Sequence, residues 1–157
     1  MITQKQHLQS TPFKLKAGIG GCIAICLLAW LSEAADQPLL MAPFGASCVL
    51  LFALPNSPLA QPKNLIGGHF LAALVGLTLV VLMGENSWSM GLAVGVAILL
   101  MQLTGTTHPP AGATPLVVMG MPHHLSTLFF PILTGSLLLL LMAFLFHRTA
   151  QTPYPTT

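Results

Sequence analysis

The chain has 157 residues, of which 54% are hydrophobic and only 5% are Asp, Glu, Lys or Arg. Ordinary soluble domains carry about 25% charged residues, so this chain has too little charge to cover a soluble globule. A formal net charge of +2 without a basic cluster argues against a nucleic-acid partner. We therefore expect an integral membrane protein whose main partner is the lipid bilayer.

Four apolar segments are long enough to cross a bilayer, because a spanning helix needs about 20 residues. The predicted helices cover residues 17–32, 64–83, 88–103 and 128–146. Residues 1–13 form a polar N-terminal tail and residues 148–157 a polar C-terminal tail around a single transmembrane domain of residues 14–147. Lys14 and Lys16 ahead of the first segment also imitate a secretory signal, but the later segments match this one in character and favour a span.

Two further apolar stretches are too short to span, and each follows a break in the chain. Residues 44–54 reach only about 17 Å at 1.5 Å per residue, which is roughly half a membrane. Their break is the sequence APFG at residues 42–45. The second stretch, residues 111–121, follows residues 104–110, whose composition is not helical. Each stretch is predicted to be a half-helix.

The two breaks are copies of each other. A shift of 67 positions places Pro43 on Pro110 and Ser47 on Thr114, with a glycine and an alanine between them also matching. The same shift places the first long helix on the third and the second on the fourth. We therefore predict two repeats, over about residues 14–83 and 84–147, each reading helix, interrupted half-helix, helix.

The charged residues predict the topology. If each half-helix segment crosses, partly as extended chain, all five Lys and Arg residues fall on one side and all three Asp and Glu residues on the other. This satisfies the positive-inside rule with both termini cytoplasmic, in a bacterial inner membrane. The fold class is then an all-α membrane protein with two inverted repeats, a plan found in secondary transporters. If the segments re-enter and turn back instead, Lys63 moves outside and Glu85 inside, which fits the rule less well.

Inverted half-helices would point their N-termini at each other near mid-membrane. Each N-terminus leaves backbone N–H groups unpaired and carries about half a positive charge, which suits a small anion. Proline fits the first helical turn, because no N–H is needed there. The alternative is that the prolines only kink buried helices. The predicted substrate-binding residues are Pro43, Phe44, Gly45, Ala46, Ser47, Thr107, His108, Pro110, Ala111, Gly112, Ala113 and Thr114.

Histidines offer further candidates. His108 either caps the second half-helix, binds substrate or carries a proton, and Thr106 and Thr107 are alternative caps. His69 is interpreted as a gate or an interface residue near the end of its helix. The pair at residues 123–124 is interpreted as a solvated turn, and the three cysteines as packing residues, so we predict no metal site, no cofactor and no enzymatic activity.

Small residues recur at spacing four, which indicates tight helix packing within the chain or between copies. Six thin segments enclose little volume, so we expect a homo-oligomer of unspecified order. The residues concerned are Gly18, Cys22 and Cys26, then Gly68, Ala72 and Gly76, then Gly91 and Gly95.

Residues 107–114 (THPPAGAT) resemble the HPP family of integral membrane proteins, which is named for the tripeptide. Residues 43–47 (PFGAS), 61–64 (QPKN) and 67–69 (GGH) are similar to the family as well, and the resemblance covers roughly residues 14–147. It implies four membrane helices and a role in nitrite transport, the function attached to some chloroplast and cyanobacterial members. No established set of binding residues comes with it.

These observations predict a channel or transporter for a small monovalent anion, nitrite first. A neutral-solute or water pore is the first alternative, because the same polar break suits an uncharged guest. A non-transporting scaffold or signalling protein is the second.

Overall fold

The computed structural model describes residues 8, 10–121 and 128–156, and all regular secondary structure within these residues is helical. Four helical stretches are long and apolar enough to cross a membrane, which confirms the four predicted spans. They are α2 (Thr11–Ala35), α4 (Pro62–Met83), α5 (Ser87–Thr104) and Pro131–Thr149, which contains α8 (Gly135–Thr149).

The shorter elements lie at the two breaks and beside them. The first half-helix is α3 (Ala42–Cys48), which continues as the wider turns of η1 (Val49–Ala53). The second is η3 (Pro109–Ala113), which continues as α6 (Thr114–Met119). A single turn, η2 (Pro58–Ala60), leads into α4, and η4 (Leu128–Thr134) leads into α8.

Two helices extend beyond their predicted ends. The Ser10 hydroxyl accepts a hydrogen bond from Phe13 N, so α2 begins at Thr11, and Phe13, assigned to the polar tail, is a buried helical residue. α8 continues through Arg148 to Thr149, because a basic residue is favourable in the last turn of a helix.

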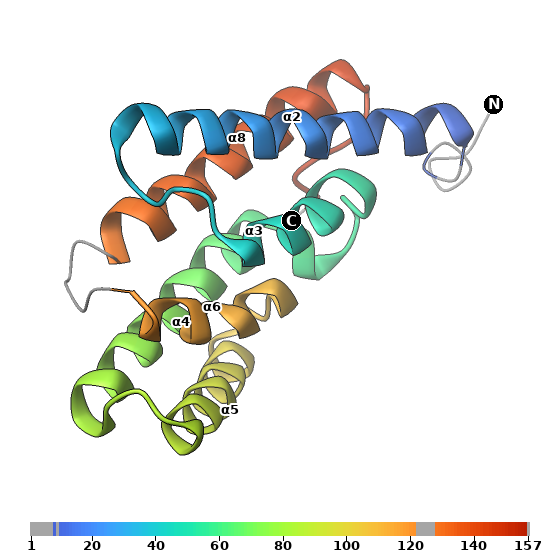
Figure 1. The fold of residues 1–157 in the computed structure, drawn as a ribbon. Coiled ribbons are helices and arrows are strands. Elements are labelled where there is room, and N and C mark those ends of the chain that lie inside the picture. The colour runs from blue at the N-terminus through green and yellow to red at the C-terminus, as the bar shows by residue number, and fades with distance from the viewer. Residues whose placement is uncertain (1–7, 9, 122–127, 157) are drawn as a thin grey trace.

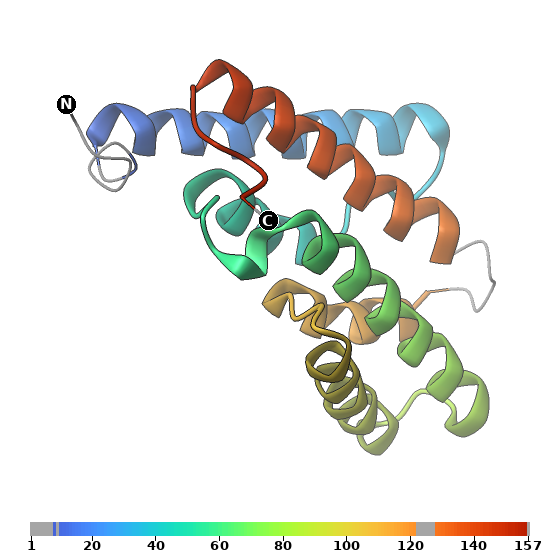
Figure 2. The ribbon, with the colours of Figure 1, turned by 180° about the vertical axis from the view of Figure 1, so that it is seen from behind.

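The third helix of each predicted repeat packs with elements of the other predicted repeat. α2, α3 and η1 contact α8, whereas α5, η3 and α6 contact α4. Figure 1 shows α2 and α8 together on one side of the molecule, with α4, α5 and α6 on the other. The two groups meet where α3 contacts η3 and where α4 contacts α8 and η4. Figure 2, seen from behind, shows α8 crossing in front of α2.

Glycines allow close approaches within each of these two groups. A Cβ at Gly68 would lie 2.8 Å from His108 Cβ and 3.0 Å from the Thr106 carbonyl oxygen. A Cβ at Gly135 would overlap the Phe44 ring and lie 2.9 Å from the Leu39 carbonyl oxygen. Gly68 therefore lets α4 pack closely against the second break, and Gly135 lets α8 pack closely against the first.

The predicted polar C-terminal tail folds back onto the turn before α4. The Tyr154 hydroxyl donates to the Ala60 carbonyl at 2.8 Å, and Thr156 N donates to Gln61 Oε1 at 2.9 Å. Burial of the Tyr154 phenol against this turn raises its pKa. The tail thus helps to hold the turn that faces the second break.

Candidate functional site

Both breaks have the same backbone construction. Met41 and His108 are extended and immediately precede the half-helices, with φ of −126° and −135°. Phe44 N donates to the Met41 carbonyl and Ala111 N to the His108 carbonyl, each at 2.9 Å. Neither half-helix has a side-chain N-cap hydrogen bond. The two turns thus share this first hydrogen bond, although the first half-helix begins as an α-helix and the second as a 3-10 helix.

A groove lies between the two breaks. It has a volume of about 590 Å³, and both half-helices line it. Three of its lining pairs are related by the 67-residue shift: Ala42 with Pro109, Pro43 with Pro110, and Ala46 with Ala113. Val49 and Leu50 complete the lining. The groove is apolar in its side chains and open on one side, and the first half-helix segment contributes more of its lining than the second.

Four fully buried polar side chains lie behind this groove, and we call them the Ser–His cluster: Ser47, His69, His108 and Thr114. Ser47 Oγ lies 3.0 Å from His69 Nε2 and 2.9 Å from His108 Nε2. His69 Nδ1 lies 2.8 Å from Thr114 Oγ1. His108 Nδ1 lies 2.7 Å from the carbonyl oxygen of Leu59, in the turn held by the C-terminal tail. The cluster therefore joins both half-helices to α4 and η2.

The carbonyl of Leu59 fixes the direction of these hydrogen bonds. A carbonyl only accepts, so His108 Nδ1 carries a proton and donates to it. With a neutral His108, Nε2 has a lone pair that accepts the one proton of the Ser47 hydroxyl when this proton is not turned to the Pro43 carbonyl, the other acceptor, at 3.2 Å. Ser47 Oγ must then accept from His69 Nε2, and His69 Nδ1 must accept from Thr114. All four links run the same way, from Thr114 towards Leu59.

The structure corrects the interpretation of two histidines. His69 is not an interface residue, because it lies about two turns inside α4, is fully buried and bonds to both half-helices. His108 does not cap its half-helix, because its ring reaches across to Ser47 and Leu59 instead. Thr106 and Thr107 do not cap it either: Thr107 Oγ1 bonds back to the Met101 carbonyl at the end of α5.

The predicted site residues outside the groove lining and the Ser–His cluster differ in their surroundings. Phe44 and Ala111 are fully buried, and the Phe44 ring packs edge-on to the His69 ring at a centroid distance of 5.2 Å. Gly45 and Gly112, by contrast, lie where a Cβ would meet nothing within 4 Å. Thr107 contributes its carbonyl, which accepts from Asn64 Nδ2 at 2.8 Å. The predicted residues therefore surround the breaks, but Gly45 and Gly112 face open space rather than a protein neighbour.

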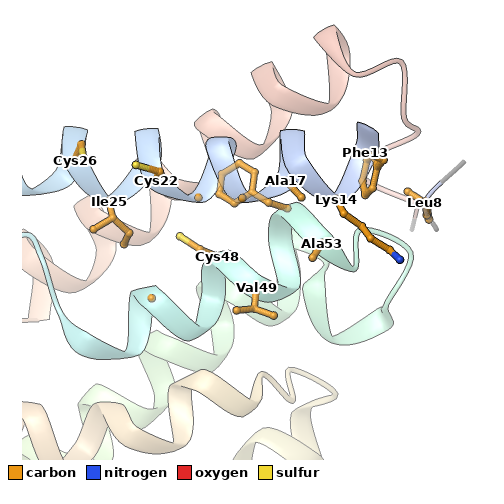
Figure 3. A pocket seen from close by; sticks show the side chains of 14 residues that line it. Leu8, Phe13, Lys14, Ala17, Cys22, Ile25, Cys26, Cys48, Val49 and Ala53 are labelled. Atoms are coloured by element: carbon orange, nitrogen blue, oxygen red, sulfur yellow. The ribbon is translucent and has the colours of Figure 1, made fainter. Parts of the chain in front are cut away.

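A larger groove of about 640 Å³ separates α2 from α3 (Figure 3). Figure 3 shows the Cys22 and Cys48 side chains lining it and the Lys14 amine at one end. The thiols are free, and its other lining residues are almost all apolar. Among the described residues that line it, there is no buried polar cluster comparable to that at the breaks, so it is a weaker candidate site.

Across the described residues, no group of three or more His, Cys, Asp or Glu side chains is arranged to hold a metal ion. The histidines at positions 123–124 lie outside the described residues. The arrangement at the breaks is instead one of backbone N–H groups, hydroxyls and imidazoles.

Comparison with known proteins extends the resemblance seen in the motifs. Residues 7–155 match the family described as HPP, transmembrane region. A transmembrane protein of Dictyostelium discoideum is 41% identical over 145 residues, covering 86% of this chain and 50% of that protein. A second transmembrane protein of the same organism is 40% identical over 120 residues, which cover 71% of this chain and 39% of that protein. The chain thus spans half or less of these relatives, and no solved structure matches it.

Proposed function

Because the chain belongs to the HPP transmembrane family, we propose that it is a membrane channel or transporter for a small monovalent anion, with nitrite as the first substrate to test. The observation that carries the proposal is the groove shared by the two breaks. An interrupted helix at membrane depth is tolerated where it is buried in protein or lines a path for solute. Two matching interruptions that meet at one groove are more than two independent kinks require.

The contacts between elements support inverted repeats. Gly68 packs on the Thr106 carbonyl and Gly135 on the Leu39 carbonyl, and each residue of one contact is 67 positions from its counterpart in the other. The same shift relates two pairs of contacting elements. It places α4 on α8 and η1 on α6, and α4 contacts α6 whereas α8 contacts η1. A two-fold relation between the halves explains both observations, with the groove on its axis. An axis in the membrane plane is the arrangement found in secondary transporters.

The anion is proposed to bind the first turns of the half-helices. Backbone N–H groups near Gly45, Ala46 and Gly112 belong to turns without side-chain caps, and such turns favour negative charge. Among the described residues, none that lines the groove is Lys or Arg, so attraction rests on these backbone dipoles. Weak attraction without a fixed cation suits a path that the anion must also leave.

We propose a homo-oligomer because the groove is open on one side and the single chain does not enclose it. Small residues on the outside of α5 favour close helix packing between copies: at Gly91 and Gly95 a Cβ would meet nothing within 4 Å. Gly68, Ala72 and Gly76 serve packing within the chain instead, since they are buried inside it. In a bacterial inner membrane, both termini would be cytoplasmic.

A neutral-solute pore is the second candidate, and the apolar side chains of the groove favour it. The two candidates differ in their response to anions. Nitrite should raise the thermal unfolding temperature of an anion transporter in detergent, whereas it should leave that of a neutral-solute pore unchanged.

The direct test uses the purified full chain in liposomes. Nitrite entry down an inward gradient should exceed entry into protein-free liposomes and should saturate with nitrite concentration. Entry equal to that of protein-free liposomes, with helical content intact by circular dichroism, would contradict a transport function.

A further inference from the structure

The Ser–His cluster has room for one additional proton, and we propose that this proton travels with the anion, so that the protein is a proton–anion symporter. This inference rests on the proposed transport function and deepens it. It begins from the bonding capacity of Ser47, which is the only member of the cluster that contacts both imidazoles.

In the neutral cluster, every polar atom is already used. Ser47 donates its single proton to His108 Nε2 and accepts from His69 Nε2, while His108 Nδ1 donates to the Leu59 carbonyl. A proton cannot be added to His108 Nε2 while the Ser47 hydroxyl points at it, because both atoms would then be donors.

The structure supplies a second acceptor for the Ser47 hydroxyl. The Pro43 carbonyl oxygen, one helical turn earlier in α3, lies 3.2 Å from Ser47 Oγ. Rotation of the hydroxyl onto this carbonyl frees a lone pair on Ser47 Oγ. His108 Nε2 can then take up a proton from water and donate it to Ser47, which accepts from both imidazoles and donates to Pro43. Both protonation states therefore leave no buried polar atom of the cluster unpaired, and they differ by one hydroxyl rotation.

The proton position is adjacent to the groove. Pro43 lines the groove, and its carbonyl is the one that receives the rotated hydroxyl. Pro109, the residue after His108, lines the groove from the other half-helix. A cation on His108 beside a half-helix N-terminus is unfavourable by itself, whereas an anion in the groove compensates it. Anion and proton therefore favour each other, and the pair is neutral as it passes an apolar lining.

Other titratable groups do not take part in this bonding. In the elements packed around the cluster, the remaining ones are Cys48 on α3, Lys63 on α4, His147 and Arg148 on α8, Tyr154 of the tail over η2, and Lys14, Lys16, Cys22, Cys26 and Glu33 on α2. Within the described residues, no hydrogen bond joins any of these groups to the cluster. Leu59 is half-buried and its bond to His108 is not fully enclosed, so a proton from solvent reaches the cluster most directly from the η2 turn.

The test measures protons and nitrite together. Liposomes containing the full chain and an internal pH dye receive an inward nitrite gradient at equal pH, with potassium and valinomycin clamping the membrane potential. We expect internal acidification at one proton per nitrite above the protein-free rate, nitrite entry that is insensitive to the clamped potential, and uphill nitrite accumulation when the outside is more acidic. Protein-dependent nitrite entry that follows the membrane potential and moves no protons would overturn the symport while leaving nitrite transport intact. Absence of protein-dependent nitrite entry would overturn both.

Two variants locate the proton. His108→Gln keeps a polar side chain but cannot take up a proton, and we expect at least a tenfold loss of acid-driven accumulation. His147→Gln is the matched control, because His147 is also a buried histidine whose Nε2 donates to a carbonyl, that of Leu51, but it lies outside the cluster. It should retain the coupling of the natural chain. Acid-driven accumulation that survives in His108→Gln, or fails equally in both variants, would contradict the assignment to His108.

Discussion

Ser47 and Thr114, which occupy the same place in the two half-helices, bind opposite ring nitrogens of one buried imidazole, that of His69. The distances are 3.0 Å to Nε2 and 2.8 Å to Nδ1. One side chain on α4 thereby fixes the spacing of the two half-helices. Stability and transport are therefore expected to respond to the same few side chains.

The first prediction concerns Ser47→Ala. This change leaves Nε2 of both His69 and His108 without a partner in a buried site, and each such loss costs roughly 1–3 kcal/mol. We expect the free energy of unfolding in mixed micelles to fall by about 2–4 kcal/mol. Ser136→Ala is the matched control, since Ser136 is equally buried but bonds to helix carbonyls of Ile132 and Leu133. Equal losses in the two variants would show that the Ser–His cluster carries no special stability.

Glycine substitutions test the contact between each third helix and the opposite break. Ala at Gly68 or Gly135 would force a methyl group against carbonyl oxygens and rings, and overpacking of this kind costs about 1–3 kcal/mol. Ala at Gly112 meets open space and sits in a helical turn, so stability should be unchanged or slightly higher. Thermal unfolding of the three variants in detergent checks this order of stabilities. A Gly135→Ala variant as stable as Gly112→Ala would contradict the packing described.

The C-terminal tail is predicted to contribute through Tyr154. Tyr154→Phe removes the bond to the Ala60 carbonyl and should cost about 0.5–1.5 kcal/mol at neutral pH. Because burial raises the pKa of this phenol, its contribution is complete below the ordinary tyrosine pKa of about 10 and is lost as pH rises beyond it. The stability difference between the natural chain and Tyr154→Phe should thus shrink above pH 10. A stability difference that grows above pH 10 would contradict a raised pKa of Tyr154 in the folded protein.

The topology can be read from single cysteines. In a variant with Cys22, Cys26 and Cys48 replaced by Ala, one Cys is placed at Asn56 or at Glu85. If the half-helix segments cross the membrane, a membrane-impermeant maleimide added to intact cells should label position 85 and not position 56. The reverse pattern would mean that the segments re-enter and turn back.

The sequence predicted the long helices and the breaks well, because both depend on local composition. Charge-free apolar runs define the spans, and Pro43 and Pro110 mark the starts of the half-helices. The sequence also singled out Ser47, His108 and Thr114, which the structure brings to one cluster.

The role of His69 could not be predicted in the same way. Its position near one end of a long helix suggested an interface, and only the packing of α4 against both half-helices buries it. One signal was available, since Gly67 and Gly68 directly before it imply a close neighbour, which proved to be Thr106 and His108. The predicted 67-residue repeat likewise did not indicate that α4 and α8 each pack with elements of the other predicted repeat, because that depends on contacts between segments far apart in the sequence.

The most direct test of transport through the breaks is nitrite entry in liposomes containing Ala46→Phe or Ala113→Phe. Both alanines are exposed and line the groove from opposite half-helices, so a phenyl ring can fill the groove without disturbing the core. Ala53→Phe is the control, because Ala53 is an exposed alanine in η1 that lines the α2–α3 groove instead. We expect nitrite entry to fall at least tenfold in both groove variants and to persist in the control. Unchanged entry in Ala46→Phe and Ala113→Phe, with both proteins folded, would place the path elsewhere.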